Sequence, residues 1–180
     1  MTETLAFGTV DTVLGRLLVG ETETGVVSLH FHDTPAARAR TAKAAGLPVV
    51  DAPARLAPAL AALRDYFTGD LKHFELPIDW RLTSDVQRQV LSTLYETVPY
   101  GQVLTYGDLG ERSSTGVHAQ VIGQVMGGNP IPLIVPCHRV VASNGLGGYS
   151  GGSGVEVKRW LLTLEGSVPA TLDWDIDRGP

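Results

Sequence analysis

The chain has 180 residues, of which 43% are hydrophobic, so it is long enough to bury one good core or two small lobes. No apolar run approaches the roughly 20 residues of a membrane span, and the N-terminus lacks the features of a secretory signal, so we expect a cytoplasmic protein without membrane contact. The net charge of −5 argues against a general nucleic-acid binder, because phosphate contacts need Lys and Arg, but it leaves room for a local site.

The sequence contains few cysteine and histidine residues at the spacing that a metal site needs. The single cysteine excludes an internal disulfide and a multi-cysteine zinc site. His30 and His32 would share one face of a strand, but neither they nor His73 have a cysteine or an acidic partner at ligand spacing. We therefore expect no metal.

The first part of the chain predicts a small antiparallel sheet followed by a helix. Residues 5–32 contain β-rich runs with turns at Gly15 and Gly25, whereas residues 34–48 lose this pattern. Apolar residues then recur at helical spacing, at Leu56, Leu60, Leu63 and Phe67. Gly69 stands where a C-terminal helix cap belongs, and residues 71–80 read as an extended connection between two lobes.

A second group of helices is predicted after residue 83. Ser84 and Gln87 form a capping box at the start of a helix, whose apolar residues are spaced by four: Val86, Val90 and Leu94. Residues 105–112 and 117–126 predict two short helices joined by a four-residue turn, which is the outline of a helix-turn-helix. Many helical hairpins share this outline. A last helix is expected at residues 155–165.

Cys137 is the main candidate for chemistry. A lone cysteine is most often a buried structural thiol, but here Pro136 precedes it and His138 and Arg139 follow, so a base and a cation lie close by. Residues 132–136 read as a buried extended segment, which would turn His138 away from the sulfur. A relay through water, with a carboxylate behind the histidine, is then expected. The sequence pattern alone does not identify which of the 19 Asp and Glu residues is that carboxylate.

The sequence GNPIPLIVPCHRVV, residues 128–141, resembles the signature of the O6-alkylguanine-DNA alkyltransferases, also called methylated-DNA–protein-cysteine methyltransferases. The likeness continues in LRDYFTGDLKHFELPIDW, VLSTLYETVPYGQVLTYGDLG, GGYSGG and VKRWLLTLEG, and covers residues 5–166. It implies an α/β fold with an N-terminal α/β lobe, an antiparallel sheet plus helix, at residues 1–80. A helical C-terminal lobe with a helix-turn-helix of winged-helix type would follow at residues 81–170, and the short acidic end, residues 171–180, reads as a loose tail.

The resemblance also implies an activity. The alkyl group of O6-alkylguanine in double-stranded DNA would pass irreversibly to Cys137, once per molecule, without a metal or an organic cofactor, in a monomer. The family's Glu–His–water–Cys relay corresponds to Glu165, His138 and Cys137, and Tyr106 matches the tyrosine that donates a proton to the leaving guanine. The implied pocket residues are Asn129, which braces the turn, and Ser150, Gly151, Val140 and Met126. The implied DNA-contacting residues are Ala119, Gln120, Gly123 and Arg139.

Some positions depart from the family pattern. Gln120 stands where an arginine usually fills the gap left by the flipped base, Gly127 stands where a basic residue is common, and residues 117–128 contain no Lys or Arg. We therefore expect weak DNA binding with a shallow salt dependence. The loop at residues 137–149 is shorter than usual and residues 152–158 are longer, which leaves the size range of the alkyl group open.

Two alternatives remain at this point. The first is a divergent relative that binds altered DNA, or uses another alkyl donor, without repairing ordinary O6-methylguanine; the neutral recognition helix favours it and the retained Cys137 counts against it. The second is a turnover enzyme, such as a cysteine hydrolase using Cys137 and His138, but the sequence contains no recognisable oxyanion-hole pattern.

Overall fold

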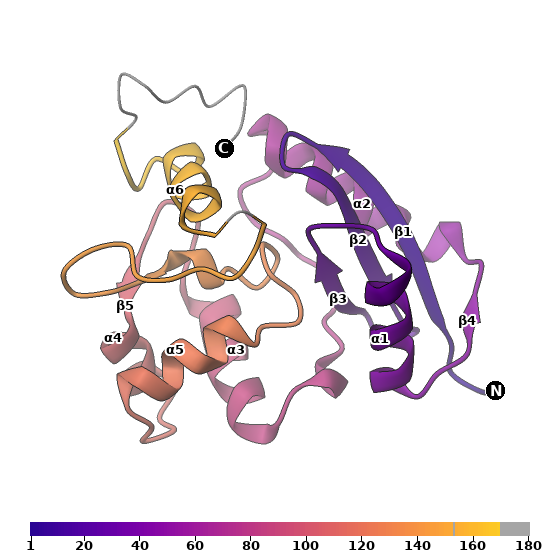
Figure 1. The fold of residues 1–180 in the computed structure, drawn as a ribbon, viewed down its shortest axis with the longest axis horizontal. Helices are drawn as coiled ribbons and strands as arrows, with labels where there is room; N and C mark the ends of the chain where they lie inside the picture. Colours follow the sequence, from indigo (N-terminus) through magenta and orange to yellow (C-terminus); the bar gives the residue numbers. More distant parts are fainter. Residues whose placement is uncertain (153, 170–180) are drawn as a thin grey trace. The chain divides into compact units, whose positions relative to one another are not determined.

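The computed structural model describes residues 1–152 and 154–169, and the chain divides into two compact units at Leu82/Thr83 (Figure 1). The predicted tail at residues 171–180 lies outside the described residues. Within the described part, no helix is long and apolar enough to cross a membrane.

The first unit is built on a four-stranded mixed sheet of order β3-β2-β1-β4. The strands β1 (Leu5–Thr12), β2 (Gly15–Glu21) and β3 (Val26–His30) pair antiparallel, as the sequence predicts. A fourth strand, β4 (Val49–Val50), pairs parallel with β1, so the expectation of a purely antiparallel sheet is wrong at this edge. Two exposed valines carry too little pattern to predict a strand.

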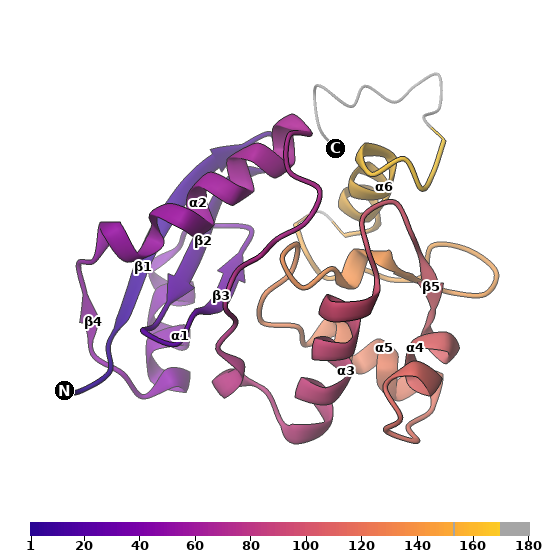
Figure 2. The ribbon, with the colours of Figure 1, turned by 180° about the vertical axis from the view of Figure 1, so that it is seen from behind.

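Two helices flank this sheet on opposite faces, α1 (Pro35–Ala45) and α2 (Pro53–Thr68) (Figures 1 and 2). The sequence predicts only α2, and Gly69 caps it in the left-handed conformation as expected. Its buried residues are Leu56, Ala59, Leu63 and Tyr66, whereas Leu60 and Phe67 are half-buried. Helix α1 buries only Ala37 and Thr41, so it has almost no apolar repeat by which to predict it.

The segment between the two units runs beside β3. The amide of Val26 donates to the Pro77 carbonyl at 2.9 Å, and the amide of Asp79 donates to the Val26 carbonyl at 2.8 Å. Gly25 is required at this contact, because its φ is +153° and a Cβ there would lie 2.3 Å from the Pro77 oxygen. The predicted extended connection is therefore anchored on the first unit, and the short 3-10 helix Trp80–Leu82 ends it.

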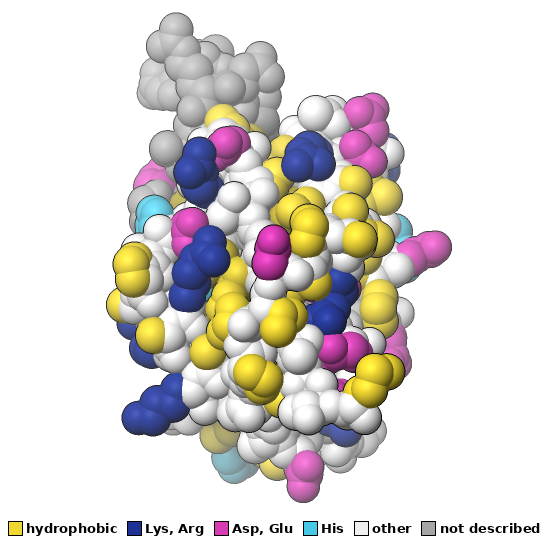
Figure 3. All heavy atoms as spheres, turned by 90° about the vertical axis from the view of Figure 1, so that its right-hand side faces the viewer, with side chains coloured by type: hydrophobic (Ala, Val, Ile, Leu, Met, Phe, Trp, Pro, Cys, Tyr) yellow, Lys and Arg dark blue, Asp and Glu magenta, His cyan; other side chains and the backbone are white. Residues whose placement is uncertain are grey.

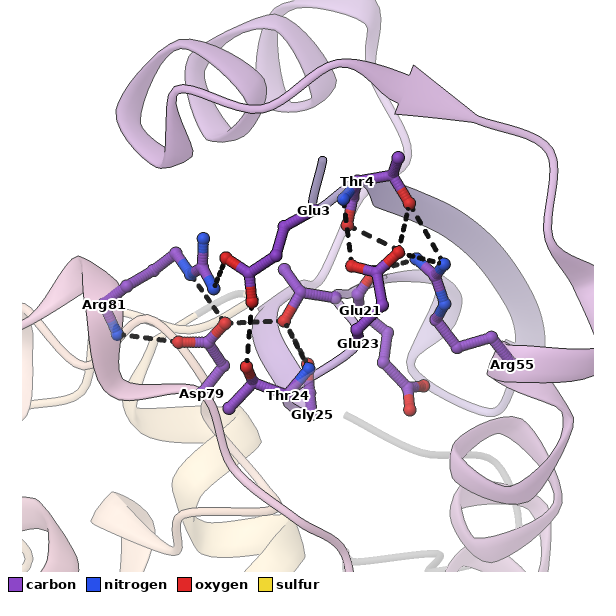
Figure 4. A network of polar contacts seen from close by, with 10 residues as sticks. Glu3, Thr4, Glu21, Glu23, Thr24, Gly25, Arg55, Asp79 and Arg81 are labelled. Carbon is purple, nitrogen blue, oxygen red and sulfur yellow. Dashed lines mark hydrogen bonds and ion pairs between the residues drawn. The ribbon is translucent and has the colours of Figure 1, made fainter. Parts of the chain in front are cut away.

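Charged side chains from distant parts of the first unit meet in one network (Figure 4). Arg81 bonds Asp79 at 2.6 Å and Glu3 at 2.9 Å, and Arg55 bonds Glu23 at 2.7 Å. The network therefore links the residues before β1 to the β2–β3 turn, to the first turn of α2 and to the connecting segment.

The second unit is mainly helical. Its elements in the described residues are α3 (Asp85–Thr97), β5 (Leu104–Thr105), α4 (Tyr106–Arg112), α5 (Ala119–Gly127), the 3-10 helix η2 (Cys137–Arg139), β6 (Val140–Val141) and α6 (Val155–Leu164). Helix α3 begins with the predicted capping box: Gln87 N donates to Ser84 Oγ at 3.3 Å, and Ser84 N donates to Gln87 Oε1 at 2.9 Å. Val90 and Leu94 are buried, but Val86 is 43% exposed, so the expected apolar face is one residue shorter.

Helices α4 and α5 form the predicted helical pair, joined by residues 113–118. Thr105 caps α4 through a second capping box with Asp108. The two helices approach closely at Gly110, where a Cβ would lie 3.1 Å from the Val117 carbonyl and 3.5 Å from Ile122. Strands β5 and β6 pair in parallel beside them, which brings the start of α4 next to the segment that follows Cys137.

Candidate active site

Cys137 lies at the start of η2, and the segment before it is not extended. Residues 131–135 form consecutive turns, with Val135 N bonded to the Ile131 carbonyl at 2.9 Å and Leu133 at a φ of +69°. The prolines around this segment remove the backbone donors that a strand would need, which explains why the prediction was wrong. Successive residues of a 3-10 helix are about 120° apart around its axis, so Cys137 and His138 do not point to opposite faces.

Asn129 holds this turn from the inside. Its Nδ2 donates to the Val135 carbonyl at 2.9 Å, and its Oδ1 accepts from Ile131 N at 3.0 Å. Both halves of the amide are thus used on the backbone that leads to Cys137. Asn129 also hydrogen-bonds the Cys137 sulfur, so it fixes both the turn and the thiol.

His138 meets a carboxylate that the residues alone did not identify. Its Nε2 lies 2.8 Å from Glu165 Oε1, and both side chains are fully buried. Its Nδ1 is also buried and has no hydrogen-bond partner among the described residues. The ring is therefore oriented from one side by Glu165, directly after α6, while its second nitrogen remains available for a proton.

Arg139 is engaged inside the protein. Its Nε and Nη2 donate to Glu165 at 2.9 and 3.0 Å, its Nη1 donates to the Val98 carbonyl at 2.8 Å, and only 6% of the residue is exposed. The expectation that Arg139 contacts DNA conflicts with this geometry. Burial raises the pKa of the Glu165 carboxyl, but the charges and hydrogen bonds of His138 and Arg139 outweigh it, and the pKa lies below its ordinary value.

The surroundings of Cys137 have two opposite effects on the pKa of its thiol. Burial raises the pKa of the thiol, and a hydrogen bond from Asn129, the charge of Lys158 and a hydrogen bond from Tyr149 counter the rise. The nearby cation is therefore Lys158 and not the expected Arg139. Burial raises the pKa of Tyr149 well above its usual range, and its contact with Cys137 adds to the rise, so this hydroxyl stays protonated and donates.

Lys158 is a functional candidate that the sequence reasoning missed. It is completely buried in α6, and its Nζ donates to the carbonyls of Val140 at 2.6 Å and Gly148 at 3.1 Å. Burial lowers its pKa to about 8, against the opposing effect of Cys137. Its place between Val157 and Trp160, in the apolar face of a helix, is the signal that could have identified it, because buried lysines are rare and need partners.

Cys137 opens into a pocket of about 310 Å³. The pocket is lined by Tyr106, Gly123, Met126, Gly127, Cys137, Gly148, Tyr149 and Ser150. Of the expected pocket residues, Met126 and Ser150 line it. Asn129 and Val140 do not line it; they support it, the first through the turn and the second through its carbonyl on Lys158. Gly151 is likewise outside the lining.

Tyr106, the first residue of α4, reaches the same pocket. Burial raises the pKa of its hydroxyl and the charge of Cys137 raises it further, while a hydrogen bond with the Gly148 backbone acts in the opposite direction. A phenol that keeps its proton is suited to donating it to a leaving group.

The surface expected to meet DNA carries little positive charge. Ala119 and Gln120 are exposed on the first turn of α5, whereas Gly123 is half-buried at the pocket. Of the five Lys and Arg residues in the described part of the second unit, two are buried at the site, and Arg88, Arg112 and Arg159 remain at the surface. Figure 3 draws a different face, which belongs mainly to the first unit, and on it Lys/Arg and Asp/Glu side chains are interspersed.

Comparison with known proteins gives a consistent result over the chain. Residues 5–80 match the family described as "6-O-methylguanine DNA methyltransferase, ribonuclease-like domain", and residues 85–167 match the corresponding "DNA binding domain". A methylated-DNA–protein-cysteine methyltransferase of Mycolicibacterium paratuberculosis is 34% identical over 162 residues, covering 89% of this chain and 92% of the relative. A protein of the same name from Mycobacterium bovis is 41% identical over 122 residues, covering 67% of this chain and 72% of the relative.

Solved structures agree with the sequence relatives. The crystal structure of Mycobacterium tuberculosis OGT in complex with DNA has a TM-score of 0.74 and 31% identity, covering 92% of this chain and 96% of that one. The O6-methylguanine-DNA methyltransferase of Pyrococcus kodakaraensis has a TM-score of 0.62 and 25% identity, covering 91% of this chain and 99% of that one. The predicted family is therefore confirmed: this chain belongs to the 6-O-methylguanine DNA methyltransferases, the methylated-DNA–protein-cysteine methyltransferases of DNA alkylation repair.

Proposed function

We propose that this protein repairs O6-alkylguanine in double-stranded DNA by moving the alkyl group irreversibly to the sulfur of Cys137, once per molecule. The observation that carries the proposal is the pocket at Cys137: the thiol opens into it, and a buried His138–Glu165 pair stands directly behind the same 3-10 turn. All residues that the reaction needs come from one chain, so a monomer suffices.

The chemical step is an in-line displacement. The Cys137 thiolate attacks the alkyl carbon, a sulfur–carbon bond forms, and the carbon–oxygen bond breaks with its electron pair passing to guanine. The leaving guanine takes a proton, for which Tyr106 is the donor that lines the pocket. The thioether product has no easy reverse reaction, so the protein is consumed.

The thiolate needs assistance because burial disfavours it. We assign the removal of the thiol proton to a relay of Glu165, His138 and a water molecule. Glu165 orients His138 through the contact at 2.8 Å, and the buried His138 Nδ1 accepts the thiol proton through the water molecule. Lys158 and Tyr149 then stabilise the negative sulfur, the first by its charge and the second by a hydrogen bond. The relay thus removes the proton, and Lys158 and Tyr149 stabilise the anion that remains.

The target base must leave the duplex to reach this pocket, since the alkyl carbon is inaccessible inside the base stack. We propose that the gap left in the base stack is filled by two exposed residues of the first turn of α5, Ala119 and Gln120. Glutamine can wedge and hydrogen-bond, but it brings no charge to the phosphates, so affinity should be weak and should depend little on salt.

The test is intact-protein mass after incubation with a duplex that carries O6-methylguanine, for the wild type and for Cys137→Ser. We expect one methyl group per wild-type molecule and none on the variant, with the lesion lost from the DNA in equal amount. An unmodified wild type with unchanged DNA would favour the divergent relative, and several lesions removed per molecule would favour a turnover enzyme.

A further inference from the structure

The turn that follows α3 lies close to the residue that follows α6. Gln102 N donates to the Pro99 carbonyl at 3.2 Å, and Gly101, the third residue of this turn, has a φ of +83°. A positive φ at this place is typical of a type II turn, and glycine adopts it without steric cost. A Cβ on Gly101 would lie 3.3 Å from the Glu165 carbonyl oxygen. The turn therefore places the half-buried Tyr100 beside the backbone that carries Glu165.

The hydroxyl of Tyr100 holds the peptide group that leads into Glu165. It donates to the Leu164 carbonyl at 3.0 Å. The last carbonyls of a helix have no partner within the helix, so Leu164, the last residue of α6, needs a donor from elsewhere. That carbonyl and the Glu165 amide belong to one planar peptide group, and the amide donates to the Leu161 carbonyl at 2.9 Å. This peptide group is therefore held on one side by α6 and on the other by Tyr100.

The ring of Tyr100 contacts the side chain that holds the Glu165 carboxylate. The guanidinium carbon of Arg139 lies 5.9 Å from the ring centroid, within the reach of a cation–π contact. Arg139 donates to both carboxylate oxygens of Glu165, and also to the carbonyl of Val98, two residues before Tyr100. The short segment 98–101 thus holds the backbone of Glu165 through a hydroxyl and its carboxylate through Arg139.

We propose that Tyr100 is a positioning residue of the relay, which fixes the Glu165 carboxylate against Nε2 of His138. Tyr100 does not line the pocket at Cys137, so it acts only through Glu165. A displacement of the Glu165 backbone changes the 2.8 Å contact with His138, and with it the stability of the charged pair that forms when Cys137 loses its proton. The inference rests on the proposed function and adds a residue to the same site.

The experiment measures the pH dependence of single-turnover methyl transfer from a duplex that carries O6-methylguanine, below the urea unfolding transition of each variant. Tyr100→Phe removes the hydroxyl and keeps the ring on Arg139, whereas Tyr100→Leu removes both contacts. Ser84→Ala is the matched control, because it removes a hydrogen bond at the opposite end of α3 from this turn. The other charged and titratable groups that face the relay in the described residues stay in every variant: Arg139, Lys158, Tyr106 and Tyr149.

We expect Tyr100→Phe to slow transfer near neutral pH by about three- to tenfold, the range for the loss of one hydrogen bond, and to move the midpoint of the pH–rate profile to higher pH. The direction follows because a less firmly held Glu165 stabilises the proton on His138 less, so the thiolate of Cys137 forms at higher pH. The rates should converge at high pH, where the thiol ionises without the relay. Tyr100→Leu should show a larger shift, and Ser84→Ala should keep the wild-type midpoint.

A second readout does not depend on transfer. The imidazole nitrogen chemical shifts of His138 in the unreacted protein report its bond with Glu165, so Tyr100→Phe should change them and Ser84→Ala should not. A slower reaction with an unchanged midpoint and unchanged shifts would overturn the inference and leave Tyr100 only as a cap of α6. A wild type that transfers no methyl group would remove the proposed function, and unchanged imidazole shifts in Tyr100→Phe would in that case still overturn the positioning role.

Discussion

Replacing Glu165 with glutamine tests whether this carboxylate acts in the reaction or only in the fold. Glu165 bonds His138 at 2.8 Å and Arg139 at 2.9 and 3.0 Å; His138 and Glu165 are fully buried and the Arg139 side chain is 7% exposed. An amide in its place leaves the Arg139 charge buried without a counter-ion, which costs about 3–5 kcal/mol of the roughly 5–15 kcal/mol available to a domain. The amide also carries no negative charge to stabilise a protonated His138. Replacing the carboxylate that bonds the catalytic histidine of a hydrolase triad by an amide lowers the rate about 10⁴-fold.

Arg139→Leu is the matched control, because it breaks the same buried ion pair from the other side and leaves the His138–Glu165 contact in place. We expect both variants to lose a similar amount of stability in urea unfolding. In single-turnover transfer below the unfolding transition, Glu165→Gln should be slower by about 10²–10⁴-fold, and Arg139→Leu by no more than about tenfold. Equal rate losses in the two variants would refute the relay and leave Glu165 a structural role.

Three further outcomes are expected. Gln120→Arg should tighten binding to duplex DNA and steepen the slope of log affinity against log salt by about one unit, measured by fluorescence anisotropy; an unchanged slope would mean that this residue does not approach phosphate. The pKa of Lys158 is about 8 in the folded protein and about 10.4 in the unfolded chain. Between these two pH values the unfolded state binds more protons than the folded state, so the free energy of unfolding increases with pH. The contribution of Lys158 to stability should therefore rise by up to about 3 kcal/mol from pH 8 to 10.5. This rise should disappear in Lys158→Met, as followed by urea unfolding at several pH values. Ser84→Ala should cost about 1 kcal/mol through loss of the α3 capping box without slowing transfer; a slowed reaction would connect this helix end to the site.

Local signals in the sequence predicted most of the elements correctly. The capping box at Ser84, the left-handed cap at Gly69 and the β-rich runs before residue 32 each depend on neighbouring residues only, and the structure has them where the sequence indicates. The sequence does not predict α1, because its buried side chains are Ala37 and Thr41, which make no apolar stripe.

The site was harder to predict, because its residues come together only through the tertiary fold. The resemblance to the family supplied Glu165 as the partner of His138, but the cation beside Cys137 depends on which side of α6 is buried, and Lys158 and not Arg139 occupies that place. The sequence predicts an extended segment before Cys137 where the structure has turns, because a short apolar run has no period that distinguishes the two.

Salt should affect not only DNA binding but also the stability of the first unit, through its polar network. Two of its arginine–carboxylate pairs are partly exposed, with Arg55 and Glu23 at 22% and 44% and Arg81 and Glu3 at 23% and 46%, whereas Asp79 beside Arg81 is only 6% exposed. The pair of Arg139 and Glu165 is almost entirely shielded from water. Dissolved ions screen the first group and hardly reach the second. Raising ionic strength should therefore loosen the attachment of the residues before β1 while the acceptor cysteine keeps its surroundings, so denaturation in concentrated salt should begin in the sheet-bearing unit.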